Sequence, residues 1–126
     1  MKKRFLVVDD QSMIRCFLKD LFRHFDLDCE EARNGREAIE KWEQEKYTAI
    51  LMDIEMPVMD GLEAAAIIRA REKSEQRGYT PIYAISGCTF ADPHQKCRLA
   101  GMDGFIAKPV MINELLDIIM PLANAN

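Results

Sequence analysis

Four short apolar segments punctuate the chain and predict buried β-strands. They are rich in β-branched and aliphatic residues and cover Arg4–Asp9, Thr48–Asp53, Thr80–Ser86 and Asp103–Ala107. Each lacks the strict alternation of a strand with one solvated face, which is the pattern expected when helices cover both faces of a parallel sheet. A fifth segment, Asp28–Ala32, is more polar, and we expect it to form a strand at the edge of the sheet.

Helical periodicity fills the intervals between these strands. The clearest helix is expected to follow an N-cap at Ser12, and its apolar stripe is expected to face a core. The stripe consists of Met13, Ile14, Phe17, Leu18, Leu21, Phe22 and Phe25. Further helices are predicted over Gly35–Glu45, Leu62 to about Ser74, Phe90–Ala100 and Ile112–Leu122. Strands and helices therefore alternate five times, which predicts an α/β domain built on a parallel sheet.

The chain has 126 residues, which is the size of one domain with one core, so we assign residues 1–126 to a single domain. The interval from Asp53 to Ser86 is eleven residues longer than the interval from Asp9 to Glu31. The surplus falls in the charged stretch Arg69–Thr80. We interpret this stretch as a lengthened third helix and a solvated loop rather than as a basic binding patch.

The net charge of −4 and the pI near 5.2 argue against direct binding to nucleic acid, which needs a basic surface. The first apolar run, Phe5–Val8, is too short for a signal sequence or a membrane span, so we expect a cytoplasmic protein without a membrane partner. The cysteines show no metal-binding or redox spacing and are interpreted as reduced and structural. They are Cys16, Cys29, Cys88 and Cys97.

Polar residues close most of the predicted strands. In an open parallel sheet, ligands bind beyond the carboxyl ends of the strands, so these residues are the candidates for chemistry. They are Asp9 and Asp10 after the first strand, Asp53 at the end of the Thr48 strand, Ser86 at the end of the Thr80 strand, and Lys108 with Pro109 after the last strand. All of them are expected to converge on one edge of the sheet.

Three carboxylates at one edge repel one another, by about 4 kcal/mol for two charges about 4 Å apart at an effective dielectric near 20. Lys108 supplies one positive charge, which is not enough to balance three. A cluster that offers only oxygen ligands suits Mg²⁺ or Mn²⁺ better than zinc. Because adjacent side chains in a strand point to opposite faces, Asp9 and Asp10 can both ligate directly only if the backbone turns between them. We therefore expect one of them to act through water.

A carboxylate beside a divalent cation, an ammonium group and a hydroxyl is a plausible phosphoryl acceptor. We expect Asp53 to attack in line, while the metal and Lys108 neutralise charge on the equatorial oxygens and Ser86 donates a hydrogen bond. Such a site works by positioning and has no dedicated base.

These residues resemble the receiver domain of two-component response regulators, the CheY-like fold, and the resemblance covers the whole chain. It is carried by VVDD at Val7–Asp10, MDIEMPVMDG at Met52–Gly61, IS at Ile85–Ser86 and the pair Lys108–Pro109. The resemblance implies a sheet of strand order 2-1-3-4-5 flanked by five helices. It also implies that Asp53 takes a phosphoryl group from a histidine of a sensor kinase or a histidine phosphotransfer protein.

The same resemblance assigns roles within the site. Asp10, Asp53 and the backbone carbonyl of Glu55 are expected to ligate Mg²⁺ directly, and Asp9 to act largely through water. Ser86 is the hydroxyl expected to meet the phosphoryl group, and Lys108 is its ion-pair partner. The Lys108–Pro109 bond is expected to be cis, although few X-Pro bonds are.

Phe105 occupies the position of the switch aromatic, where many receivers carry tyrosine. Phosphorylation is expected to draw Ser86 and Phe105 inward and to change partner binding on the face formed by the fourth helix, the fifth strand and the fifth helix. The partner is an unknown downstream protein, and the resemblance also allows a phosphorylation-dependent dimer. The domain is expected not to be an enzyme, although it assists its own phosphorylation and dephosphorylation.

Two other function classes remain in view. A metal-dependent phosphohydrolase also uses an aspartate nucleophile after a strand, but it commonly needs a second acid two residues later, where this chain has Glu55. A phosphorylation-independent interaction module would keep the fold and lose acidic residues or the lysine. A dinucleotide-binding domain is disfavoured because no glycine-rich loop follows the first strand. The start of the sequence favours a stand-alone regulator, whereas the MPVMDG motif resembles receivers attached to hybrid kinases.

Overall fold

The computed structural model describes residues 3–87 and 93–125, in which strands and helices alternate along the chain. The strands are β1 Arg4–Val8, β2 Asp28–Ala32, β3 Ala49–Asp53, β4 Ile82–Ser86 and β5 Gly104–Ala107. The helices are α1 Ser12–His24, α2 Gly35–Gln44, α3 Gly61–Ser74, α4 Pro93–Leu99 and α5 Ile112–Asn124. The prediction for the fourth helix extends to residues 90–92, which lie outside the described residues.

All five strands pair in parallel in the order β2-β1-β3-β4-β5, which confirms the predicted α/β fold. The polar strand β2 lies at the edge, also as predicted. Because β1 lies between β2 and β3, the chain reverses its direction of winding there, and such a reversal opens a crevice at the carboxyl ends. The pairing of Val8 with Met52 brings the residues that follow them, Asp9 and Asp53, to adjacent positions.

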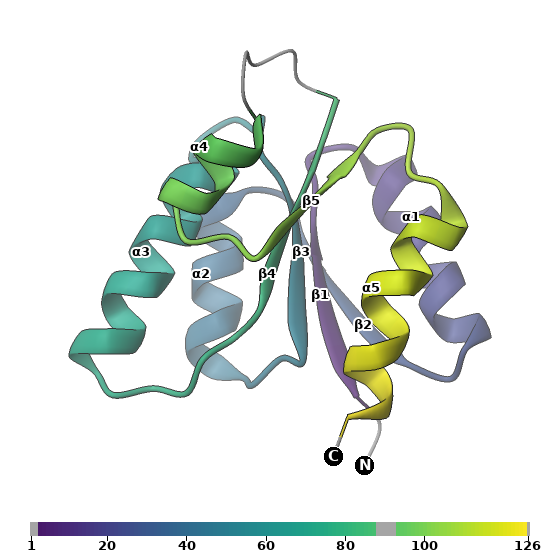
Figure 1. Cartoon of the computed structure of the whole chain (residues 1–126), viewed down its shortest axis with the longest axis horizontal. Coiled ribbons are helices and arrows are strands. Elements are labelled where there is room, and N and C mark those ends of the chain that lie inside the picture. The colour runs from purple at the N-terminus through teal and green to yellow at the C-terminus, as the bar shows by residue number, and fades with distance from the viewer. Residues whose placement is uncertain (1–2, 88–92, 126) are drawn as a thin grey trace.

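Helices cover both faces of the sheet, with α2, α3 and α4 on one side and α1 and α5 on the other (Figure 1). Each face has its own apolar core. Trp42 and Ile68 pack with Leu6 and Ile50 on the first face. Phe22 and Leu115 pack with strand residues such as Phe5 on the second. Because both faces of these strands are buried, successive residues along them are apolar instead of alternating with polar ones.

Helix α1 differs from its predicted form in two respects. Ser12 is its first helical residue and not its N-cap, a position that Gln11 occupies without a side-chain hydrogen bond. The apolar stripe is only partly buried: Leu18 is in the core, whereas Met13 is 83% exposed and Phe17 is 44% exposed. Phe25, after the helix, is also exposed. The helix starts beyond the carboxyl end of β1, so its first turns lie past the sheet that would cover them.

Two side-chain caps define the beginnings of helices α2 and α3. Asn34 accepts a hydrogen bond from the Glu37 amide, and Asp60 accepts one from the Glu63 amide, each satisfying an otherwise unpaired donor. Asp60 therefore starts α3 at Gly61, one residue before the predicted Leu62.

The segment Arg69–Thr80 contains the last turns of α3, as predicted, but the rest is not the simple solvated loop that the sequence suggested. The Arg69 guanidinium donates to the Gly101 carbonyl, to Glu72 and to Asp103, and its face lies 4.0 Å from the centre of the Tyr79 ring. The buried Glu72 also accepts the Thr80 amide at 2.8 Å. This Arg69 network ties α3 to the segments that enter β4 and β5.

Arg69→Met is expected to lower the free energy of unfolding by about 2–4 kcal/mol, because it leaves the buried Glu72 carboxylate without its cation. Arg71→Met is the matched control on the same helix, since Arg71 pairs with Glu43 and Glu75 at the surface. We expect a clearly smaller loss for the control. Urea unfolding followed by Trp42 fluorescence measures both, and equal losses would contradict the structural role of the Arg69 network.

Candidate functional site

Three carboxylates meet at the carboxyl ends of β1 and β3. Oxygen atoms of Asp9, Asp10 and Asp53 all lie within 4.8 Å of one another. Asp9 and Asp53 are buried, whereas Asp10 is exposed to solvent. The parallel pairing of β1 with β3 produces this approach, as the positions of the strand ends predict.

The backbone turns between Asp9 and Asp10, so their side chains do not point to opposite faces as they would in a continued strand. The Asp9 carboxylate folds back and its Oδ1 accepts the Gln11 amide at 2.9 Å. The Asp9 carbonyl accepts a hydrogen bond from the guanidinium of Arg15 at 2.7 Å. Sequence patterns did not single out Arg15, whose contact with Asp9 is to a backbone atom.

Lys108 places its ammonium group between the two buried carboxylates. Its Nζ lies 3.2 Å from Asp53 Oδ2 and 3.1 Å from Asp9 Oδ2. The contact with Asp9 lacks hydrogen-bond geometry, and Asp9 Oδ2 is a buried oxygen without a hydrogen bond in the part of the chain that the structure describes. One ammonium therefore contacts two of the three carboxylates, and a buried oxygen is left for a further cation. This donor set fits Mg²⁺, which prefers oxygen ligands and retains waters.

The pKa values of Asp53 and Lys108 are set by burial and by the neighbouring charges. Burial, and after it the Asp9 carboxylate, raise the pKa of Asp53 to about 6, and the Lys108 ammonium only partly opposes this. For Lys108, burial would lower the pKa, but the Asp53 and Asp9 carboxylates outweigh it and raise the pKa overall. Lys108 is therefore a permanent cation at this site.

The remaining predicted site residues occupy different places. Ser86 is buried at the carboxyl end of β4, one residue after Ile85, the pairing partner of Asp53. The Glu55 amide donates to Asp53 Oδ1 at 3.2 Å, which holds the start of the β3–α3 loop against the carboxylate. Phe105 on β5 is half-buried and packs against the His94 ring of α4, with ring centres 5.1 Å apart. The Lys108–Pro109 peptide bond is cis.

Gly61 is a further residue on which the site depends. A Cβ atom there would lie 2.2 Å from the carbonyl oxygen of Asp53, so only glycine fits at the start of α3. Its amide donates to the Ile54 carbonyl at 2.8 Å. Between these points Val58 has a φ of 71°, a rare conformation for a β-branched residue. The MPVMDG motif thus folds into a tight loop that brings Gly61 back against the backbone of Asp53.

The family model for the response regulator receiver domain matches residues 5–120. The chain belongs to the response regulator receiver domain family. It is accordingly a receiver domain of a two-component phosphorelay. Members of the family bind Mg²⁺ at an acidic pocket, and the Asp9, Asp10 and Asp53 cluster is the acidic pocket of this receiver.

The curated relatives of this receiver are histidine kinases. The hybrid signal transduction histidine kinase A of Dictyostelium discoideum is 34% identical over 117 residues, which cover 92% of this chain and 5% of that protein. This chain spans 12% or less of the length of eight curated histidine kinases that it resembles.

Two solved structures are informative neighbours. One is the receiver domain of the Saccharomyces cerevisiae response regulator Ssk1, crystallised with the histidine phosphotransfer protein Ypd1. It has a TM-score of 0.88 and 27% identity, and the match covers 97% of this chain and 89% of that chain. The other is the receiver domain of the Pseudomonas aeruginosa sensor histidine kinase PA1611, which has a magnesium ion in its active-site cleft. Its TM-score is 0.84 and its identity 28%, with 99% of this chain and 100% of that chain covered.

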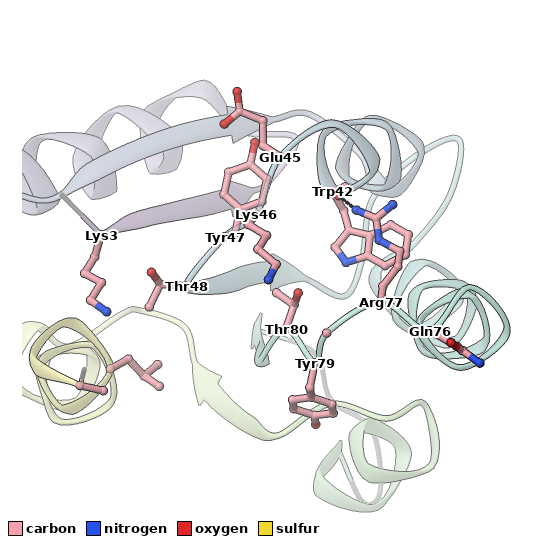
Figure 2. Close-up of a pocket in the computed structure, with 13 residues that line it drawn as sticks. Lys3, Trp42, Glu45, Lys46, Tyr47, Thr48, Gln76, Arg77, Tyr79 and Thr80 are labelled. Atoms are coloured by element: carbon pink, nitrogen blue, oxygen red, sulfur yellow. Dashed lines mark hydrogen bonds between the residues drawn. The ribbon is translucent and has the colours of Figure 1, made fainter. Parts of the chain in front are cut away.

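A separate hollow of about 840 Å³ lies at the opposite end of this receiver, where the strands begin (Figure 2). Lys3, Thr48 and Thr80 line it from the starts of β1, β3 and β4. Arg77 lies over the Trp42 ring at its rim, 4.1 Å from the ring centre. The acidic cluster and Lys108 are not among its lining residues, so the hollow is separate from the acidic pocket. Among the described residues, none of the helices has the length and apolar character needed to cross a membrane.

The pKa of Asp53 generates a pH prediction for the receiver with EDTA present. The folded carboxyl titrates near 6 and the unfolded one near 3.8, so the folded state takes up the proton first as the pH falls. Deprotonated Asp53 therefore destabilises the fold above pH 6. Asp53→Asn is expected to raise the free energy of unfolding at pH 7.5 by on the order of 2 kcal/mol.

This gain is expected to shrink as the pH falls from 6 towards 4, because wild-type Asp53 then becomes neutral too. Denaturant unfolding of both proteins at several pH values measures it. A wild type that is the more stable protein at pH 7.5, or a difference that does not change with pH, would contradict the electrostatic account.

Proposed function

We propose that this receiver is a phosphorylation-controlled switch in which Asp53 accepts the phosphoryl group. The observation that carries the proposal is the position of Asp53. It is the buried carboxylate held by Lys108 on one oxygen and by the Glu55 amide on the other. These contacts orient the carboxylate towards the edge where Asp9 and Asp10 gather.

The oxygen ligands support binding of Mg²⁺, with Mn²⁺ as an alternative of similar chemistry. Asp10, Asp53 and the backbone carbonyl of Glu55 are the proposed direct ligands, and Asp9 is proposed to contribute through water. The related receiver of PA1611, which holds a magnesium ion in its cleft, supports this assignment. The bound ion supplies neutralisation of the carboxylates and of the oxygens of the incoming phosphoryl group.

The proposed reaction is a direct transfer. A carboxylate oxygen of Asp53 attacks the phosphorus in line, the new O–P bond forms, and the P–N bond to the donor histidine breaks. The electron pair of that bond returns to the imidazole nitrogen. The Lys108 ammonium neutralises charge on an equatorial oxygen, and the Ser86 hydroxyl donates a hydrogen bond to another. No side chain needs to remove a proton from the carboxylate at neutral pH, since Asp53 titrates near 6.

Regulation, not turnover, is the proposed outcome. The domain assists its own phosphorylation and dephosphorylation but is not proposed to be an enzyme acting on external phosphates. The competing phosphohydrolase function needs an acid–base group two residues after the nucleophile. Glu55 occupies that position, but its side chain is exposed and its contact with Asp53 is through the backbone amide.

The proposed donor is a sensor histidine kinase or a histidine phosphotransfer protein, as the complex of the related Ssk1 receiver with Ypd1 suggests. The donor has to cover the edge that holds Asp53. The exposed apolar side chains of Met13 and Phe17 lie at that edge, on the first turns of α1. They offer an apolar contact for the donor beside the acidic pocket.

The downstream change is proposed to start at Ser86 and Phe105, which move towards the phosphoryl group and alter the face formed by α4, β5 and α5. The contact between Phe105 and His94 links β5 to α4 and supports this route. An unidentified protein, or a second copy of this chain, then binds that face.

Acetyl phosphate with Mg²⁺ is expected to add 80 Da to the protein, because the small donor needs only the acceptor and its site. Asp53→Asn is expected to abolish the adduct, and Glu55→Gln is the matched control that leaves the acceptor in place. Intact mass spectrometry measures the adduct, and EDTA is expected to suppress it. Release of many equivalents of phosphate per protein would favour the phosphohydrolase, and no adduct in the wild type would favour a phosphorylation-independent module.

Beryllofluoride, a mimic of the bound phosphoryl group, is expected to shift amide resonances of α4, β5 and α5 in addition to those of the acidic pocket. Ser86→Ala is expected to confine the shifts to the pocket, because the link from the phosphoryl group to β4 is removed. Two-dimensional NMR with Mg²⁺ present measures both proteins. Identical shift patterns in wild type and variant would contradict the proposed role of Ser86.

A further inference from the structure

The peptide group that joins Asp9 to Asp10 decides whether both carboxylates reach the same site. Alternation along a strand would direct them to opposite faces of the sheet. Their oxygens nevertheless lie within 4.8 Å of each other and of Asp53. The ladder continues as far as the Asp9 amide, which donates to the Ala32 carbonyl at 3.1 Å. The chain therefore leaves the strand geometry at the next peptide group, whose oxygen is the Asp9 carbonyl.

Arg15 holds that carbonyl. One guanidinium nitrogen donates to the Asp9 oxygen at 2.7 Å, and the Nε donates to Glu31 Oε1 at 2.7 Å. The Arg15 side chain is only 12% exposed, so it is packed into this position from the first turn of α1. Glu31 lies next to the carboxyl end of β2, where the sheet positions it. The guanidinium thus connects Glu31 of β2 to the turning peptide after β1.

Lys19 supplies a natural comparison one turn further along the same helix. Its ammonium donates to the other oxygen of Glu31 at 2.8 Å. The hydrogen bonds that the structure gives for Lys19 reach Glu31, whereas those of Arg15 reach both Glu31 and the Asp9 carbonyl. Each side chain contributes one positive charge and one ion pair with the same carboxylate. The hydrogen bond to the Asp9 carbonyl is what distinguishes Arg15.

We propose that Arg15 is a positioning residue for the cation site, because it fixes the turn that directs Asp9 and Asp10 towards Asp53. The proposal rests on the proposed function, in which these carboxylates bind Mg²⁺ and Asp53 is phosphorylated. Arg15 touches neither the ion nor the phosphoryl group. Residues that orient metal ligands commonly change metal affinity by roughly 10–100-fold when they are replaced.

Loss of the Arg15 charge and loss of its hydrogen bond to the Asp9 carbonyl predict opposite changes in Mg²⁺ affinity, which makes the proposal testable. Removing a positive charge near three carboxylates strengthens their attraction for a cation. Loss of the hydrogen bond to the Asp9 carbonyl frees the turn. Part of the Mg²⁺ binding energy is then used to order the carboxylates, which weakens binding. Lys19→Met changes mainly the charge, while Arg15→Met changes the charge and the geometry together.

Isothermal titration with Mg²⁺ at pH 7.5 compares wild type, Arg15→Met and Lys19→Met, with Mn²⁺ as a second probe. Arg15→Met is expected to bind Mg²⁺ about 10-fold more weakly than wild type. Lys19→Met is expected to bind Mg²⁺ at least as tightly as wild type. Initial rates with acetyl phosphate are expected to fall in Arg15→Met at low Mg²⁺ and to recover at saturating Mg²⁺, which a general loss of folding would not produce.

Equal affinities for Arg15→Met and Lys19→Met would overturn the proposal, as would a rate defect that saturating Mg²⁺ fails to correct. Arg15→Lys, which keeps the charge, is the second variant if the methionine variant does not fold. Its affinity is expected to lie below that of wild type, because a single ammonium does not reproduce the guanidinium fork, and wild-type affinity would overturn the proposal. A wild type that binds neither cation would instead refute the proposed function.

Discussion

Repulsion among three carboxylates at one end of a parallel sheet is the constraint around which the rest of the molecule is organised. Asp9 and Asp53 are buried because β1 and β3 are adjacent inner strands, and their charges have no room to separate. Lys108 reaches them from the end of β5, two strands away from β3. The sheet order therefore matters for charge as much as for packing, since only the carboxyl ends of parallel strands bring these groups together.

Stabilising contacts are concentrated at the other end of the domain. The Arg69 network joins α3 to the entries of β4 and β5, and Arg77 lies over Trp42 while donating to its carbonyl at 2.8 Å. These paired charges lie far from the acidic pocket along the strand direction. The acidic pocket, where like charges crowd together, is thus supported by the paired charges at the opposite end of the sheet. This agrees with the general tendency of functional sites to be held in place by the surrounding structure.

Local patterns predicted the strands closely, because burial on both faces leaves a continuous apolar run. They also predicted Asp9, Asp10, Asp53 and Lys108 as one cluster, since strand ends follow directly from strand boundaries. The same patterns overestimated the buried face of α1. Periodicity places Met13 on the apolar stripe, but it does not show that the sheet ends before this residue. Arg15 and Gly61 escaped prediction for another reason. Both act on backbone carbonyls, those of Asp9 and Asp53, and side-chain patterns carry no record of such contacts.

The hollow at the starts of the strands is lined by Lys3 near one end of the chain and by Leu122 and Ala125 near the other. The two ends of the chain thus leave the domain together, on the side away from Asp53 (Figure 1). A receiver with this geometry can be joined to a longer chain through two neighbouring ends. Both junctions to a longer chain would lie side by side where the strands begin, at the end of the domain opposite the acidic pocket.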